Sequence, residues 1–344
     1  MLKETMGKIT NRQIQLAARP IGEPKKEDLI LIEEEITSPA EGQLLLQNRF
    51  LSLDPYMRGR MNPSKSYAKA VEVGEVMTGG TVGEVLESRH PDFQPGELVV
   101  GTGGWQEYSM LDGSQCRKVD PGSPSPSLAL GVLGMPGVTA YTGLENIGKP
   151  QSGETLVVAA ASGAVGAVVG QIAKIRGARA VGIAGSRDKC DYAKNESGFD
   201  ECLNHRDPDL AGKLKEACPK GIDVYFENVG GAVFEAVQPL FNEFARIPVC
   251  GLISHYNDTQ LPQGPNPTPR LMRDILVKRL TYRGFIVWDF ASQEAEALQN
   301  LAAWIEEGRL LYREDFVDGL ENAPEAFFGL LQGKNFGKLL VRLS

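Results

Sequence analysis

Residues 154–177 read ETLVVAAASGAVGAVVGQIAKIRG, and this stretch decides the fold. Its first part, 154–161, is apolar from Leu156 onward and predicts a buried strand. Its second part, 163–177, predicts a helix that ends at a glycine. The turn between them, ASGAVG at 161–166, fits A-x-G-x-x-G, a variant of the dinucleotide-binding fingerprint. Because a strand precedes this turn and a helix follows it, the stretch predicts a dinucleotide-binding fold.

The turn is made of small residues, as a phosphate site requires. Backbone amides must come close to a pyrophosphate, and the N-terminus of the helix adds about half a positive charge. Gly163 would allow that approach, and Gly166 would allow the helix to pack closely on the strand. The cofactor-binding candidates in the turn are therefore Ser162, Gly163, Ala164, Val165 and Gly166. The alternative is a Gly/Ala-rich helix start whose small residues serve packing alone.

The next predicted strand, 179–185, indicates which dinucleotide binds. A site for NAD usually carries Asp or Glu about 20 residues past the fingerprint, on the ribose hydroxyls. Here the chain reads AGSRDK at 184–189, and no acid closes the strand. Ser186, Arg187 and Lys189 instead offer a hydroxyl and two cations to a 2′-phosphate, so the segment favours NADPH. The alternative is a solvated, charged helix start.

Predicted strands and helices alternate beyond this stretch. Strands are expected at 179–185, 201–205, 222–230, 245–253 and 280–288, and helices at 188–197, 209–218, 231–241, 269–279 and 292–308. Six such alternations are typical of a doubly wound parallel sheet with right-handed crossovers. We expect this Rossmann domain, an α/β fold, to span 129–307.

The N-terminal part of the chain has a different rhythm. Apolar-rich stretches at 29–37, 42–53, 80–88 and 96–111 are separated by Pro and Gly, and PGSPSPS at 121–127 resembles a linker or surface turn. This spacing predicts a compact, mostly β domain over 1–128. The tail, 308–344, returns to strand and turn character, and we expect it to complete that domain.

Composition excludes several classes of function. The 344 residues carry 36 Lys and Arg against 44 Asp and Glu, and this net charge of −8 argues against general nucleic-acid binding. Residues 156–173 carry no charge, but their Ala, Gly and Ser content suits a strand, turn and helix better than a membrane span. Five cysteines without a C-x-x-C pair and only three histidines indicate reduced thiols and no metal site. With no signal-peptide pattern at the start, we expect a cytoplasmic protein.

Several longer motifs occur in order along the chain. They are DPYMRGRM at 54–61, GMPGVTAY at 134–141, ENVGG at 227–231, CGLISHYN at 250–257 and GKNFGK at 333–338. Together with the ASGAVG turn and AGSRDK, they make the sequence resemble the zinc-free branch of the medium-chain dehydrogenase/reductase superfamily. Within that branch it is similar to the prostaglandin reductases, plant double-bond reductases and bacterial curcumin reductases, over nearly the whole chain.

The resemblance implies a GroES-like N-terminal domain beside the Rossmann domain. It also implies NADPH-dependent reduction of the carbon–carbon double bond of α,β-unsaturated ketones or aldehydes. Residues 1–128 contain one cysteine, Cys116, and one histidine, His90, which is too few for the catalytic zinc of related enzymes.

The resemblance also assigns cofactor residues one by one. It places Ser186 and Lys189 on the adenosine phosphate. It places Thr139, Asn228 and Asn335 in segments that line the nicotinamide. Relatives often carry a tyrosine after an asparagine on the third strand, near the same phosphate. Here the corresponding residue is His205, which either takes over that contact or simply ends the strand.

Tyr256 is the candidate catalytic residue. Reduction of an enone places a hydride on the β-carbon and leaves negative charge on the former carbonyl oxygen, which a hydrogen-bond donor must stabilise. Tyr256 follows a predicted strand end, at the edge where open α/β sheets bind ligands, and it matches the active-site tyrosine of the family. A phenol is protonated at neutral pH and can donate to an enolate. The alternative is a tyrosine that only packs on the substrate.

Both predicted domains contain candidate substrate residues. Tyr56 and Tyr67 are candidates for contacts with the substrate carbonyl, and Met135, Phe285 and Trp288 for an apolar pocket; ordinary packing is the alternative for each.

Two other functions compete with enone reduction: an NADPH quinone oxidoreductase, and an NADPH-binding sensor or structural protein with little turnover. By analogy with the family, we expect a homodimer formed through the edge strand at 279–288.

Overall fold

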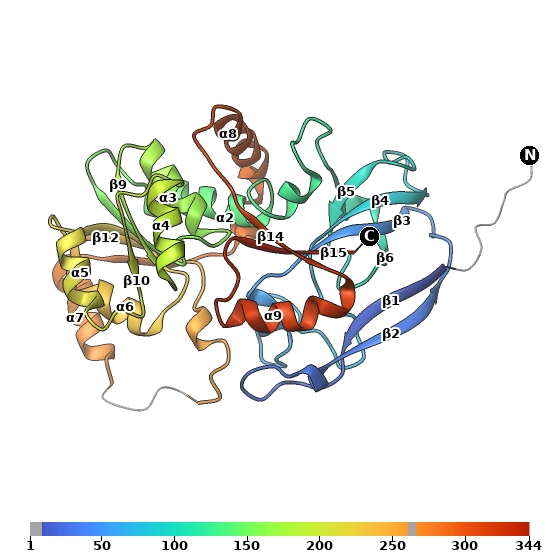
Figure 1. Ribbon diagram of the computed structural model, residues 1–344, viewed down its shortest axis with the longest axis horizontal. Coiled ribbons are helices and arrows are strands. Elements are labelled where there is room, and N and C mark those ends of the chain that lie inside the picture. Colours follow the sequence, from blue (N-terminus) through green and yellow to red (C-terminus); the bar gives the residue numbers. More distant parts are fainter. Residues whose placement is uncertain (1–8, 261–265, 344) are drawn as a thin grey trace, which may run out of the picture. The chain divides into compact units, whose positions relative to one another are not determined.

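The computed structural model describes residues 9–260 and 266–343 (Figure 1). The chain forms two compact units. The described part of unit 1 comprises 9–131, 314–335 and 339–343, and that of unit 2 comprises 132–260, 266–313 and 336–338. The segment from 314 onward thus belongs mainly to unit 1, although it follows unit 2 in the sequence.

Unit 2 is built on a six-stranded sheet in the order β10-β9-β8-β11-β12-β13. The strands are β8 (Thr155–Ala159), β9 (Arg179–Ala184), β10 (Glu201–Asn204), β11 (Ile222–Phe226), β12 (Phe241–Val249) and β13 (Thr281–Gly284). Every neighbouring pair is parallel. Because the chain order reverses between β8 and β11, the sheet has its topological switch point there, and dinucleotides bind at the carboxyl ends of strands at such a point.

Helices precede, connect and follow the strands of this sheet. They are α2 (Met135–Gly143), α3 (Gly166–Ile175), α4 (Arg187–Asn195), α5 (Leu210–Ala217), α6 (Gly231–Val237), α7 (Thr268–Lys278) and α8 (Glu294–Glu306). The apolar cluster under α5 and α6 takes Val157 and Ala159 from β8. Since side chains alternate along a strand, Leu156 and Val158 point to the opposite face, where α3 packs. The predicted Rossmann fold is confirmed.

Unit 1 is mostly β-structure, as predicted. An antiparallel pair, β1 (Ile9–Leu16) with β2 (Leu29–Ile36), stands beside a seven-stranded sheet in the order β14-β15-β3-β4-β5-β7, with β6 on β3. The strands of that sheet are β3 (Gln43–Ser52), β4 (Thr81–Ser88), β5 (Leu98–Gly101), β6 (Tyr108–Asp112), β7 (Arg117–Lys118), β14 (Glu314–Asp318) and β15 (Lys338–Arg342). Two helices complete the unit, α1 (Tyr56–Arg60) and α9 (Ala323–Leu331).

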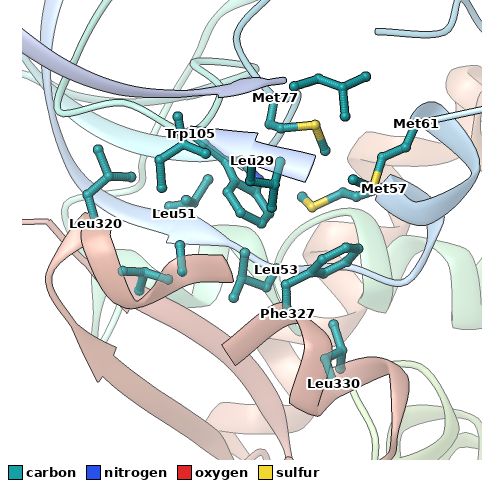
Figure 2. Packing of buried hydrophobic residues seen from close by; sticks show 14 of the residues in the cluster. Leu29, Leu51, Leu53, Met57, Met61, Met77, Trp105, Leu320, Phe327 and Leu330 are labelled. Atoms are coloured by element: carbon teal, nitrogen blue, oxygen red, sulfur yellow. The ribbon is translucent and has the colours of Figure 1, made fainter. Parts of the chain in front are cut away.

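The late residues of the chain are held in unit 1 by strand pairing and by a shared core. β15 pairs antiparallel with β3, with Val341 opposite Leu51. Figure 2 shows Phe327 of α9 beside Trp105, whose ring centroid lies 5.5 Å from that of Phe327 in an edge-on arrangement. Both side chains are fully buried, so α9 is an integral part of this core.

Several element predictions need correction. The helix expected at 231–241 ends at Val237, and Phe241 already belongs to β12, because Pro239 cannot donate within a helix. The strand expected at 222–230 ends at Phe226, where a turn begins. β1, α2 and α9 are elements that the sequence analysis did not predict as such. Among the described residues, no helix is long and apolar enough to cross a membrane, and the uncharged segment 156–173 forms β8, the turn and α3.

Candidate active site and cofactor site

The phosphate turn leaves no room for a side chain at its last position. β8 ends at Ala159, and Ala160 then takes a left-handed conformation with φ 55°. A Cβ on Gly166 would lie 2.3 Å from the carbonyl oxygen of Ala160, so only glycine lets α3 start here. A Cβ on Gly163 would lie 3.1 Å from the same oxygen, which is tight but less severe. At the start of α3 the N–H of Ala167 donates to the carbonyl oxygen of Gly163 over 3.0 Å, so the turn leads directly into the N-terminus of the helix, where a phosphate binds.

Ser162 is anchored by the last segment of unit 2. Its hydroxyl donates a hydrogen bond to the carbonyl oxygen of Phe336 over 2.9 Å, and the residue is 6% exposed. The guanidinium of Arg313 lies 3.7 Å from the centroid of the Phe336 ring, and Tyr192 meets the same ring edge-on with centroids 5.2 Å apart. This cluster, which the sequence analysis missed, fixes one side of the phosphate turn.

The residues expected at the adenosine phosphate meet at the ends of β9 and β10. Ser186 is the N-cap of α4, and its hydroxyl accepts the backbone N–H of Lys189 over 3.3 Å. His205 lies against Gly185, since a Cβ there would be 3.3 Å from its Nε2 atom. Burial lowers the pKa of His205, and the charges of Arg206 and Lys189 lower it further. The site expected for the adenosine phosphate is therefore positively charged, and the imidazole of His205 within it is neutral.

Arg187 is exposed to solvent, whereas Ser186 and Lys189 are half-buried. Its side chain is 91% exposed and lies 3.7 Å from the carboxylate of Asp191, one helical turn further along α4. Arg206, which the sequence analysis did not consider, acts electrostatically on His205 and follows it directly in the chain. The sequence does carry a signal for Arg206, because it is a basic residue that follows the third predicted strand.

Asn228 and Tyr256 come together at the switch point. The Asn228 amide donates to the carbonyl oxygen of Ala159 over 3.1 Å, so it ties the end of β11 to the strand that carries the phosphate turn. Tyr256 follows a short helical turn at 253–255. A Cβ on Gly251 would lie 3.2 Å from the Tyr256 hydroxyl and 3.4 Å from the Asn228 carbonyl oxygen, so both groups neighbour one backbone position. His255 instead faces Asp258, with its Nδ1 atom 2.7 Å from Oδ2.

The other expected residues of unit 2 have mixed environments. Thr139 is nearly buried in α2 and donates to the carbonyl oxygen of Met135 over 2.7 Å. Phe285 is buried between the rings of Phe226 and Phe290, as a core residue is. Trp288, by contrast, is 63% exposed. Their expected roles at the nicotinamide and in an apolar pocket stay predictions.

The expected residues of unit 1 lie around a buried arginine. The guanidinium carbon of Arg60 lies 4.4 Å from the ring centroid of Tyr67 and 5.7 Å from that of Tyr56. Arg60 also donates to the carbonyl oxygen of Ala68 over 3.1 Å, so it links α1 to the loop that carries Tyr67. Burial raises the pKa of Tyr56 well above its usual value, which keeps this phenol protonated. Asn335 also belongs to unit 1, and its expected contact with the nicotinamide stays a prediction.

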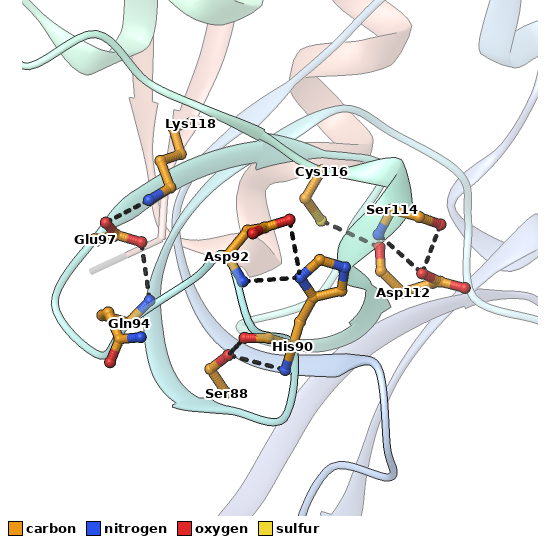
Figure 3. Close-up of polar contacts among 9 residues, drawn as sticks. All are labelled: Ser88, His90, Asp92, Gln94, Glu97, Asp112, Ser114, Cys116 and Lys118. Atoms are coloured by element: carbon orange, nitrogen blue, oxygen red, sulfur yellow. Dashed lines mark hydrogen bonds and ion pairs between the residues drawn. The ribbon is translucent and has the colours of Figure 1, made fainter.

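The histidine and cysteine of the N-terminal domain take part in local loop contacts. Figure 3 shows His90, whose Nδ1 atom accepts the backbone N–H of Asp92 over 3.3 Å, and Cys116, whose thiol donates to the carbonyl oxygen of Asp112 over 3.5 Å. Burial raises the pKa of Cys116 to about 11. Among residues 9–260 and 266–343, no group of three or more His, Cys, Asp or Glu side chains could hold a metal ion.

The fold and this site define the class of the protein. Residues 12–119 match a family described as the N-terminal domain of oxidoreductase, and residues 164–305 match one described as zinc-binding dehydrogenase. A mostly β unit combined with a six-stranded Rossmann sheet is the architecture of these enzymes. The chain belongs to the medium-chain dehydrogenase/reductase family.

Individual relatives cover nearly the whole chain. The NADPH-dependent curcumin reductase of Escherichia coli (strain K12) is 53% identical over 335 residues, which are 97% of each protein. The NADP-dependent 2-alkenal reductase of Nicotiana tabacum is 40% identical over 98% of each protein. A crystal structure of CurA from Vibrio vulnificus in complex with NADPH aligns with a TM-score of 0.94 and 53% identity, over 97% of this chain and 99% of the other. The resemblance inferred from the motifs is confirmed.

Proposed function

We propose that the chain is an NADPH-dependent reductase of the carbon–carbon double bond of α,β-unsaturated ketones and aldehydes. The observation that carries this function is 53% identity, over nearly the whole length, to an NADPH-dependent curcumin reductase. The 40% identity to a 2-alkenal reductase supports activity on simple enals as well as on aryl enones. The geometry of the switch point agrees with this function, because the Tyr256 hydroxyl lies against Gly251, a backbone position that the carbonyl oxygen of Asn228 also neighbours.

The residues present fit NADPH. Gly166 lets α3 start directly against the end of β8, so a pyrophosphate would meet the N-terminus of this helix at the turn 161–166. Ser186, Lys189 and His205 gather at the ends of β9 and β10, where they would hold the 2′-phosphate. Asn228, Thr139 and Asn335 would line the nicotinamide. When bound, the cofactor supplies the hydride that the β-carbon accepts.

Tyr256 would act on the substrate oxygen. As the β-carbon gains a hydride, negative charge develops on the carbonyl oxygen, and the Tyr256 hydroxyl would donate a hydrogen bond to it. The α-carbon then takes up a proton, which completes a saturated ketone or aldehyde. Loss of one such donor typically costs about 10²–10³ in kcat. We expect that loss in Tyr256→Phe, with NADPH binding unchanged.

An anaerobic screen that follows loss of NADPH absorbance tests this function. Enones, enals and quinones are supplied in parallel, and the product is analysed by mass spectrometry and NMR. We expect turnover with enones and enals, and deuterium from C4-deuterated cofactor on the β-carbon. Turnover with quinones alone, or tight NADPH binding without oxidation by any acceptor, would refute the proposed function.

We also propose a homodimer, formed through the free edge of the Rossmann sheet. Within the described residues β13 is the last strand of that sheet, and no residue of the neighbouring helix α7 is buried. Met272, Leu276 and Val277 of α7 are 58%, 77% and 56% exposed, which makes an apolar surface that a monomer would leave in water. A cytoplasmic location is supported by the five cysteines, all of which are free thiols.

A further inference from the structure

A buried carboxyl group, that of Glu227, lies directly behind the proposed site. Glu227 follows β11 and is 2% exposed. Its Oε1 atom accepts the backbone N–H groups of Val229 and Gly230 over 2.7 and 2.8 Å. The hydroxyl of Tyr225 donates to the same oxygen over 3.1 Å. Successive N–H groups that converge on one anion form a nest, and here a side chain of the same turn fills it.

The turn that this carboxyl group holds is unusual in its backbone. Gly230 and Gly231 have φ values of 77° and 55°, a backbone conformation that favours glycine. A Cβ on Gly230 would lie 3.0 Å from the ring of His255, so the turn is also packed closely against the segment that precedes Tyr256. Without the carboxyl group of Glu227 as acceptor, nothing in the local sequence would keep the N–H groups of Val229 and Gly230 directed at one point.

The same turn is clamped to the segment that carries Tyr256. The carbonyl oxygen of Glu227 accepts the N–H groups of Cys250 and Gly251 over 2.9 and 3.1 Å. The carbonyl oxygen of Asn228 accepts the N–H of Ile253 over 3.3 Å. That of Val229 accepts the N–H of Ser254 over 3.0 Å and its hydroxyl over 2.5 Å. The position of the turn therefore sets the position of residues 250–254, which lead into Tyr256.

We propose that Glu227 is a positioning residue for double-bond reduction: its carboxyl group fixes the turn 228–230 and thereby holds Tyr256 and Asn228 in register with each other. This inference rests on the proposed function, because Tyr256 and Asn228 matter only if they serve the reaction. Glu227 itself touches neither substrate nor cofactor in this scheme. Its effect passes through the backbone of the turn.

Two substitutions at position 227 and one control test the proposal. In Glu227→Ala we expect kcat to fall by between about tenfold and about 100-fold, as for other misplacements of about 1 Å. The Kd for NADPH should change far less than kcat, since the adenosine phosphate site is separate. Glu227→Gln keeps an oxygen that both N–H groups can reach, so it should restore most of kcat. Glu227→Asp, which keeps the charge but shortens the side chain, should lose kcat even if the Ala variant does not fold.

The control is an acid at the opposite end of the same strand. Asp223 accepts the backbone N–H of Thr155 over 2.8 Å and the amide of Asn242 over 2.8 Å. Asp223→Ala removes these hydrogen bonds without touching the turn 228–230. We expect it to lower the Tm and leave kcat within about twofold of the unmodified enzyme. An equal loss of kcat in Asp223→Ala would mean that Glu227 only stabilises the fold.

A double-mutant cycle with Tyr256→Phe decides whether Glu227 acts through Tyr256. If it does, Glu227→Ala should cost far less kcat in the Phe background than in the unmodified enzyme, because the group it positions is gone. Equal fold losses in the two backgrounds, or full kcat in Glu227→Asp and Glu227→Ala, would overturn the proposal. Failure of the proposed function has a different signature, since the unmodified chain would then show no enone-dependent oxidation of NADPH.

Discussion

The imidazole of His205 packs against the backbone of Gly185, with its Nε2 atom 3.3 Å from where a Cβ would stand. Two adjacent parallel strands, β9 and β10, thus contribute one residue each to the same small surface at their carboxyl ends. Burial lowers the pKa of His205, and the charges of Arg206 and Lys189 lower it further. The protonation of a histidine in this position would change when a phosphate binds, because the phosphate would favour the protonated ring.

The first prediction separates the two cations of α4. Lys189→Ala should lower the preference for NADPH over NADH in kcat/KM by about 10- to 100-fold, as expected for one lost hydrogen bond to a charged group. Arg187 is 91% exposed and lies near Asp191, so Arg187→Ala should change the preference by no more than about twofold. Kinetics with both cofactors measure this. Equal effects of the two substitutions would contradict the assignment of Lys189.

The second prediction concerns pH. Burial lowers the pKa of His205 below its usual 6.5 in the cofactor-free chain. As the pH falls, His205 therefore takes up a proton more readily in the unfolded chain than in the folded chain. The stability that depends on a neutral His205 is lost on acidification for that reason. A 2′-phosphate would favour the protonated ring, so NADPH binding should take up a proton and strengthen as the pH falls. Both effects should vanish in His205→Asn, which thermal unfolding and NADPH titration across pH would show.

The third prediction uses the two glycines of the phosphate turn. Gly166→Ala places a Cβ 2.3 Å from the Ala160 carbonyl oxygen, and backbone cannot yield as a side chain does. We expect a loss of about 1–3 kcal/mol in the free energy of unfolding, in urea and without cofactor. Gly163→Ala meets that oxygen at 3.1 Å, so it should fold nearly normally but bind NADPH more weakly. Normal stability of Gly166→Ala would contradict the close packing of α3 on β8.

The sequence predicts local features of this site well and distant ones poorly. The phosphate turn and the start of α4 at Ser186 are set by residues that are neighbours in the chain, so the sequence pattern predicts both. β1 escaped prediction because its buried positions include Asn11 and Gln13, and Asn11 finds partners far away in the chain, donating to Gln106 over 2.9 Å and accepting the backbone N–H of Tyr108 over 2.9 Å. A polar residue whose partner lies far away in the chain breaks the apolar alternation that marks a strand.

Glu227 shows the same limit at the site. In the sequence it is one acid after a buried strand, which resembles a solvated strand end. Its environment depends on Tyr225 within the strand and on the Gly230 turn, and burial raises its pKa while the N–H groups of Val229 and Gly230 oppose that rise. Only the folded turn shows that the carboxyl group points inward.

The fourth prediction concerns Arg60, which lies between two tyrosines of unit 1. Arg60→Met keeps an apolar stem but removes the cation that faces the rings of Tyr67 and Tyr56, and the hydrogen bond to Ala68. If these tyrosines contact the substrate carbonyl, as proposed from the sequence, the substitution loosens the loop that carries Tyr67, and the KM for an enone should rise with kcat nearly unchanged. The NADPH Kd serves as the control and should not move. A fall in kcat at constant KM would point to a different role.

The fifth prediction tests the apolar surface of α7. Leu276 is 77% exposed, and Met272 one turn earlier is 58% exposed, although α7 packs against β12, the strand next to the edge strand β13. If this face joins two copies of the chain, Leu276→Glu should weaken the dimer by at least about 30-fold, since a charge would then be buried at the interface. Arg270→Glu is the matched control, because it introduces the same side chain at an exposed polar position of α7. Analytical ultracentrifugation over a concentration series should give a dimer for the unmodified chain and the control, and a monomer–dimer equilibrium for Leu276→Glu. An unmodified chain that sediments as a monomer at all concentrations would rule out this interface and leave the apolar face without an occupant.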